Sequence, residues 1–168
     1  MGKNCIYFVE GSCEKQLIEA LKLPPAKLIP GKVIIFNPIQ KRLPMSHLLM
    51  IKPNSIVVFV YDTYVQDVEI LRENLSRILT YCDRVRVVHL MQVPNIEGEL
   101  VRCTDVKSVL LLTKSRATND FKSDFCRPTP QASRFLLDRH HLDADMLWRT
   151  PAPAPFDTIE RNRAVVKA

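Results

Sequence analysis

Four short and almost continuously apolar segments occupy the first half of the chain. Each is rich in β-branched or aromatic residues, and such runs are typical of strands that are covered on both faces of a sheet. The last run opens with alternating polar and apolar residues, which favours a place nearer the edge of the sheet. The predicted strands are residues 4–9, 32–37, 55–61 and 84–91.

Between these runs, apolar residues recur at three- and four-residue steps, which predicts helices. In the first such segment Leu17, Ile18 and Leu21 share one face, Ser12 is placed to cap the helix, and two prolines end it. Further helices are predicted at 44–51 and 65–81. The alternation of strand and helix predicts an α/β fold, a Rossmann-like compact parallel sheet flanked by helices.

The second half of the chain has a helical pattern and then a proline-rich end. We expect the last part to be extended, and either partly disordered or laid across the body. The chain therefore divides into an α/β core (1–100), a helical C-terminal extension packed on that core (101–148) and a Pro-rich tail (149–168). The helical candidates are 97–102, 106–112, 119–126, 131–140 and 143–148.

Composition narrows the class of protein. The 168 residues, 46% of them hydrophobic, are enough for one compact domain with a core. No apolar run approaches the ~20 residues that cross a bilayer, and no signal peptide is evident, so we expect a cytoplasmic protein without a membrane segment. Five widely spaced cysteines without a C-x-x-C pair argue against zinc and indicate reduced thiols. The net charge of +6 favours polyanionic partners, with a solvated basic surface as the alternative.

Acidic residues follow three of the predicted strands. Glu10 follows the first, Asp62 the third, and Glu97 and Glu99 the fourth. Functional groups of parallel sheets gather beyond the carboxyl ends of the strands, so these carboxylates are candidates for one site. Clustered carboxylates repel one another unless a cation joins them, and oxygen ligands suit Mg²⁺ or Mn²⁺. Such an ion could activate water at a phosphodiester, whereas the simpler alternative is a helix cap or loop role for each acid.

A basic segment with two aromatic residues lies at 114–127. Phe121 and Phe125 are four residues apart and share a helix face, and the basic groups around them are candidates for phosphate contacts. The alternative is that the aromatic rings belong to the core and the basic groups face solvent. The predicted nucleic-acid-binding residues are Lys15, Lys114, Arg116 and Lys122.

Three motifs together resemble the Toprim domain. They are V-E-G-x-x-E-K after an apolar strand, an apolar strand that ends in Asp62, and E-G-E-L after a later strand. Toprim domains occur in topoisomerases, primases, the small ribonuclease that matures 5S ribosomal RNA, and a group of phage-defence nucleases. The resemblance covers about 4–100. It implies a Mg²⁺- or Mn²⁺-dependent nuclease in which Glu10 is an acid/base or metal neighbour, Asp62 is a metal ligand, and Glu97 and Glu99 complete the site.

The chain departs from the Toprim pattern at two positions. Tyr64 stands where the second Asp of an Asp-x-Asp pair is expected, and a neutral phenol is a poor Mg²⁺ ligand. Asp67 is a possible substitute. The E-G-E-L stretch resembles the E-D-E-L of the phage-defence branch, but Gly98 replaces one acid. Two alternatives therefore remain: an eroded module that binds nucleic acid or a partner protein, and a subunit of a larger antiviral defence complex.

Overall fold

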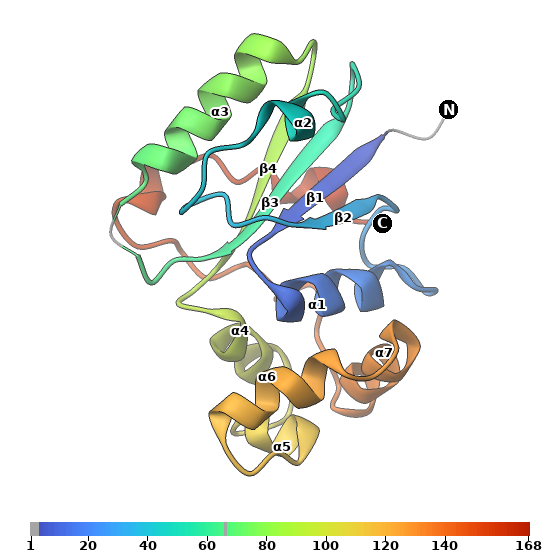
Figure 1. Cartoon of the computed structure of the whole chain (residues 1–168). Helices are drawn as coiled ribbons and strands as arrows, with labels where there is room; N and C mark the ends of the chain where they lie inside the picture. Colours follow the sequence, from blue (N-terminus) through green and yellow to red (C-terminus); the bar gives the residue numbers. More distant parts are fainter. Residues whose placement is uncertain (1–3, 66) are drawn as a thin grey trace.

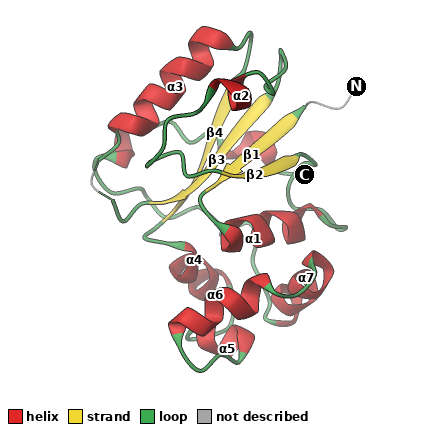
Figure 2. Ribbon diagram, viewed as in Figure 1, coloured by secondary structure: helices red, strands yellow, loops and turns green. Residues whose placement is uncertain are grey.

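The computed structural model describes residues 4–65 and 67–168. Within them, four strands form one parallel sheet with helices around it (Figures 1 and 2). The strands are β1 (Cys5–Val9), β2 (Lys32–Ile35), β3 (Ile56–Asp62) and β4 (Arg86–Gln92). Their order across the sheet is β2-β1-β3-β4. The predicted α/β, Rossmann-like arrangement is confirmed.

Helices cover both faces of this sheet. α2 and α3 lie on one side, α1 lies on the other, and α4 to α7 gather beyond α1 (Figure 1). The predicted core boundary at residue 100 falls inside α4. The helices are α1 (Ser12–Lys22), α2 (Met45–Leu48), α3 (Glu69–Tyr81), α4 (Ile96–Cys103), α5 (Val109–Thr113), α6 (Thr118–Cys126) and α7 (Pro130–Arg139).

The order of the strands creates a crevice between β1 and β3. From β1 the chain passes through α1 to β2 on one side, and it returns to β3 on the other side. Val9 pairs with Val60 of β3, and the amide of Glu10 then donates to the carbonyl of Val60 at 3.0 Å. Ligands of open α/β sheets bind outside the carboxyl ends of the strands at such a reversal, so the strand order itself positions a site here.

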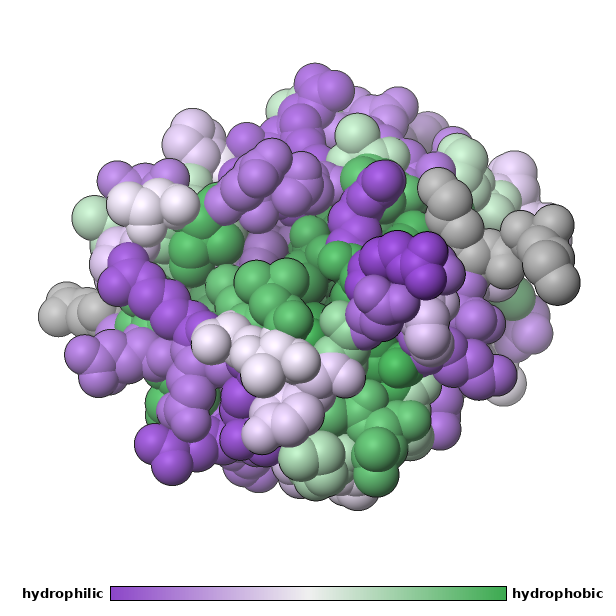
Figure 3. Space-filling model, turned by 90° about the horizontal axis from the view of Figure 1, so that it is seen from above, coloured by the Kyte–Doolittle hydropathy of each residue, from purple (hydrophilic) through white to green (hydrophobic). Residues whose placement is uncertain are grey.

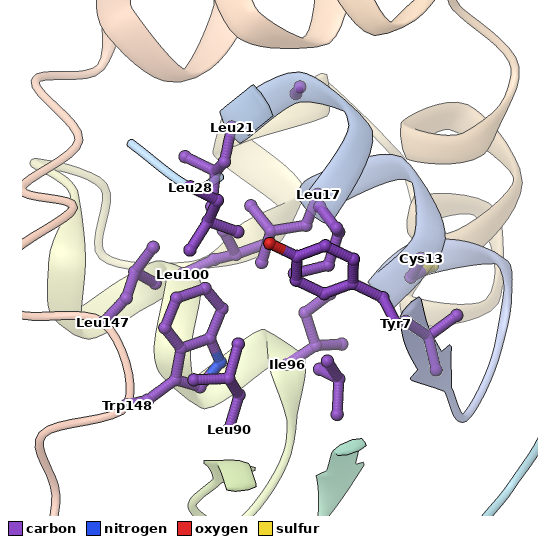
Figure 4. Close-up of a cluster of buried hydrophobic side chains, with 14 of the residues drawn as sticks. Tyr7, Cys13, Leu17, Leu21, Leu28, Leu90, Ile96, Leu100, Leu147 and Trp148 are labelled. Carbon is purple, nitrogen blue, oxygen red and sulfur yellow. The ribbon is translucent and has the colours of Figure 1, made fainter. Parts of the chain in front are cut away.

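The core has two parts because side chains alternate between the faces of a strand. Tyr7 packs toward α1 and the C-terminal helices, and the next residue, Phe8, packs toward α2 and α3. Figure 4 shows the first part, in which Trp148 lies beside Leu90 and Leu147. Because Trp148 comes from beyond α7, the helical extension shares one hydrophobic core with the sheet.

Three local predictions are wrong. Ser12 does not cap α1: Gly11 is the N-cap residue, and no side-chain hydrogen bond caps this end. The segment 143–148 is a series of turns, because the Asp143 side chain accepts a hydrogen bond from the Asp145 amide and Trp148 has a left-handed backbone (φ 57°). The strand at 32–37 was expected to be covered on both faces, but β2 is partly exposed along its length. It is an edge strand that pairs only with β1.

The Pro-rich tail lies across the body. Phe156 and Val166, in the 3₁₀ turns η1 (Phe156–Thr158) and η2 (Arg163–Val166), are fully buried. The amide of His89 on β4 donates to the carbonyl of Arg161 at 2.8 Å, so the tail covers the outer edge of the sheet. Covering an edge strand removes a template for pairing with another chain.

The face that carries α2 and α3 exposes several large hydrophobic side chains. Figure 3 views this side and shows hydrophobic residues between hydrophilic ones. Met45, Leu49, Leu79 and Tyr81 are exposed on or just after these helices. None of the described helices has the length and apolar character needed to cross a membrane.

Candidate functional site

An open pocket of about 590 Å³ lies beyond the carboxyl ends of β1 and β3. The turn from β1 into α1, the end of β3, the start of α4 and the second half of α6 form its walls. Four carboxylates line it: Glu10, Glu14, Asp62 and Glu97. The structure therefore brings together three of the four acids expected from the sequence and adds Glu14.

Glu10 links the ends of the two central strands. Its Oε2 accepts a hydrogen bond from the backbone amide of Asp62 at 3.0 Å, and its Oε1 accepts one from the Tyr64 hydroxyl at 3.3 Å. These two bonds fix the orientation of the carboxylate. Tyr64 is thus a hydrogen-bond donor to Glu10.

Asp62 is the most perturbed acid of the pocket. Burial raises its pKa to about 8, with repulsion from Glu10, Glu14 and Glu97 adding to the effect and Lys122 opposing it. Its Oδ1 is shielded from solvent and has no hydrogen-bond partner within the described residues. A buried oxygen without a donor is costly, so this carboxyl requires either a proton or a cation.

Glu14 is the residue for which the sequence analysis gave no role. It lies in the first turn of α1, is 5% exposed, and has a raised pKa, chiefly because of burial and also because of Glu10 and Glu97. A Cβ at Gly11 would lie 3.1 Å from its Oε2, so the glycine leaves room for the carboxylate. The second Glu of V-E-G-x-x-E-K was the available signal, because a helix start at residue 12 turns it back toward Glu10.

Lys122 supplies the positive charge of the pocket. Its Nζ lies 3.7 Å from Oε1 of Glu97, and this neighbour raises the lysine pKa more than burial lowers it. The lysine side chain is 63% exposed, so it stands at the rim. The other predicted nucleic-acid contacts, Lys15, Lys114 and Arg116, are exposed but do not line the pocket.

Glu99 lies away from the pocket and holds other segments together. It is fully buried and accepts hydrogen bonds from the amides of Val93 (3.2 Å) and Trp148 (2.9 Å), and it pairs with Arg102. Residues two apart on a helix face different directions, so Glu97 and Glu99 could not both enter the pocket. The predicted catalytic and metal-binding role of Glu99 has no support in this geometry.

The aromatic residues of the basic segment belong to the core. Phe121 and Phe125 are 0% and 1% exposed, and their rings stack with centroids 5.5 Å apart. They pack with the cluster that contains Leu17, so their faces are closed to nucleic-acid bases. Any nucleic acid that contacts α6 therefore meets its basic and polar side chains.

The donor set of the pocket fits a hydrated divalent ion better than a fully ligated one. Among residues 4–65 and 67–168, no three His, Cys, Asp or Glu side chains form a ready-made metal site. Mg²⁺ keeps several waters and commonly takes one or two carboxylates together with substrate phosphates. The unpartnered Oδ1 of Asp62 and the neighbouring carboxylate of Glu10 match this mode of binding.

Comparison with known proteins adds no assignment. No family model, curated protein or solved structure matches this chain. The relation to the Toprim domain therefore rests on the sequence motifs and is part of the proposal below.

Proposed function

We propose that this protein is a Toprim-like phosphodiesterase that cleaves nucleic acid with the help of Mg²⁺ or Mn²⁺, in antiviral defence. One observation carries the proposal: four carboxylates share an open pocket at the strand-order reversal, and the shielded Oδ1 of Asp62 has no partner. A divalent cation bound among these carboxylates reduces their mutual repulsion. Without a cation, protonation of the carboxylates has to reduce it.

The residues of the pocket would have different roles in this reaction. Asp62 and Glu10 would hold the ion, which supplies charge stabilisation at a phosphoryl oxygen and lowers the pKa of bound water. The backbone amide of Asp62 keeps Glu10 in place. Glu14 has a raised pKa and is therefore suited to hold a proton on its carboxyl oxygen that a leaving group can accept. Lys122 at the rim is placed to contact a substrate phosphate.

Titration calorimetry with Mn²⁺ and Mg²⁺ tests the metal site directly. The native chain is expected to bind in the micromolar-to-millimolar range, and Asp62→Ala is expected to lose this binding. Asp157→Asn is the matched control, because Asp157 is exposed and does not line the pocket. Equal binding by the native chain and Asp62→Ala, or no binding by either, would contradict the proposed site.

Cleavage assays then test the activity. Single- and double-stranded DNA and RNA are incubated with the native chain, Asp62→Ala and Asp157→Asn, each with and without Mn²⁺. Cleavage that needs both Mn²⁺ and Asp62 supports the proposal. Cleavage that persists in Asp62→Ala would assign the activity to a contaminant or to another site.

A non-catalytic binding module is the second candidate. The hydrogen bond from Tyr64 to Glu10 favours it, because the hydroxyl occupies a carboxylate oxygen that a metal ligand set would use. In this case the chain binds nucleic acid or a partner protein, alone or within a larger complex, without cleavage. Binding of labelled nucleic acid that is unchanged by chelator and by Asp62→Ala, yet weakened by Lys122→Glu, would select this candidate.

A further inference from the structure

Two cysteines from distant parts of the chain meet beside the carboxylate pocket. The sulfur atoms of Cys13 and Cys126 lie 3.2 Å apart, although the two residues are 113 positions apart in the sequence. Both are free thiols. Cys13 lies in the first turn of α1, and Cys126 is the last residue of α6. The pair therefore bridges the α/β core and the helical extension.

The thiol pair belongs to the wall of the pocket. Both cysteines line it, and Cys13 directly precedes Glu14. The Cys13 sulfur also lies 3.8 Å from the backbone oxygen of Lys122, one turn before Cys126 on α6. Figure 1 shows α6 below α1, and Figure 4 shows Cys13 with the core residues that α1 and β1 contribute. A bond between the sulfurs would fix the segment that presents Lys122.

We propose that Cys13 and Cys126 form a reversible disulfide that locks α6 onto α1 at the mouth of the carboxylate pocket. The sulfurs need to approach by only about 1 Å to reach the ~2.05 Å of a disulfide. This inference concerns the redox state of the chain and stands whether or not the pocket cleaves nucleic acid.

Glutathione disulfide is the oxidant we assign to the reaction. The thiolate of Cys126 attacks one sulfur of the oxidant, forms a mixed disulfide and releases one glutathione thiolate. The thiolate of Cys13 then attacks the Cys126 sulfur and releases the second glutathione. Two thiols of the protein are oxidised, one glutathione disulfide is reduced to two glutathione thiols, and the two protein protons pass to the released thiolates.

Exposure decides the order of these steps. Cys126 is half-buried, whereas Cys13 is 7% exposed, so Cys126 is the thiol that the oxidant reaches first. Burial raises the pKa of both thiols, which keeps the thiolate fraction small near neutral pH. We therefore expect slow thiol–disulfide exchange. The two cysteines should be reduced in a reducing solution and cross-linked after prolonged exposure to an oxidising one.

The test is an exchange experiment on the full chain in excess glutathione disulfide. Samples are quenched with iodoacetamide and mapped by mass spectrometry. We expect the loss of two alkylatable thiols, one cross-linked peptide pair containing Cys13 and Cys126, and full reversal by dithiothreitol. The melting temperature of the oxidised chain should rise by about 10 °C, because the cross-link closes a long loop of the unfolded chain. Amide exchange in 118–126 should slow at the same time.

Three variants make the result decisive. Cys13→Ser and Cys126→Ser should lose both the cross-link and the rise in melting temperature, whereas Cys82→Ser should keep both. Melting each variant in dithiothreitol verifies that it folds. A cross-link between other cysteines, stable glutathione adducts without a cross-link, or no thiol loss after prolonged incubation of the folded native chain would overturn the proposal. So would a cross-link that leaves the melting temperature and the exchange of 118–126 unchanged.

Discussion

Replacing Asp62 by asparagine removes the most perturbed charge of the pocket and keeps the shape of the side chain. In the folded protein the pKa of Asp62 is about 8, mainly because of burial and then because of Glu10, Glu14 and Glu97. In the unfolded chain an aspartate has a pKa of about 3.9. Between these two values the folded protein holds a proton that the unfolded chain has lost.

The sign and size of the effect follow from this difference. Because the folded state binds more protons, the free energy of unfolding of the native chain falls as pH rises from about 4 to about 8. Each pKa unit corresponds to about 1.4 kcal/mol. The loss of unfolding free energy that Asp62 causes is therefore absent below about pH 4 and of the order of 4 kcal/mol at pH 7. It stays constant above about pH 8.

Urea unfolding measured across this pH range, without divalent ions, compares the native chain with Asp62→Asn. The variant should be the more stable protein, by an amount that grows from about 1.5 kcal/mol near pH 5 to about 4 kcal/mol near pH 7. The exposed Asp157→Asn variant is the control and should show no such growth. A stability difference between Asp62→Asn and the native chain that stays constant from pH 5 to pH 8 would refute the electrostatic reasoning.

Adding Mn²⁺ extends the same experiment. An ion that binds the folded chain at Asp62 stabilises it according to the ratio of free ion to dissociation constant, about 2.7 kcal/mol at a hundredfold excess. The native chain should then regain stability near pH 8, while Asp62→Asn should not respond. An equal response from both proteins would place the ion elsewhere.

Three further changes test other parts of the structure. Glu99→Ala should lower the free energy of unfolding by about 3 kcal/mol, because it leaves the amides of Val93 and Trp148 without an acceptor and removes the ion-pair partner of Arg102; chemical denaturation measures this. Phe156→Ala should cost about 3 kcal/mol in the same assay if the tail is docked, and a cost near zero would refute the docking. Tyr64→Asp should tighten Mn²⁺ binding about tenfold in calorimetry by adding a charged ligand near Glu10, whereas Tyr64→Phe should not.

Periodicity was sufficient to predict most elements of the core. The apolar run of β3 is buried on both faces, as expected of a central strand. The helix predicted at 65–81 corresponds to α3, which begins at Glu69. The alternation of strands and helices predicts a parallel sheet, in which the carboxyl ends of all strands lie on the same side. Glu10 and Asp62, which follow two of these strands, are therefore expected near each other.

Local sequence could not reveal how individual acids are used. Glu97 and Glu99 have the same character in the E-G-E-L motif. Glu97 nevertheless lines the pocket, whereas Glu99 is buried and accepts hydrogen bonds from the amides of Val93 and Trp148. The difference depends on how α4 is rotated and on a loop that arrives 49 residues later. The closeness of Glu14 to Glu10 depends on where α1 begins, which the structure places at Ser12.

The sequence by itself determined the strands, the main helices and the edge of the sheet at which the acids gather, because side-chain periodicity and chain alternation are local properties. The tertiary structure alone decided the strand order that opens the crevice, the course of the tail over β4, and the meeting of Cys13 with Cys126. These features join residues far apart in the chain, and packing of the whole core fixes them.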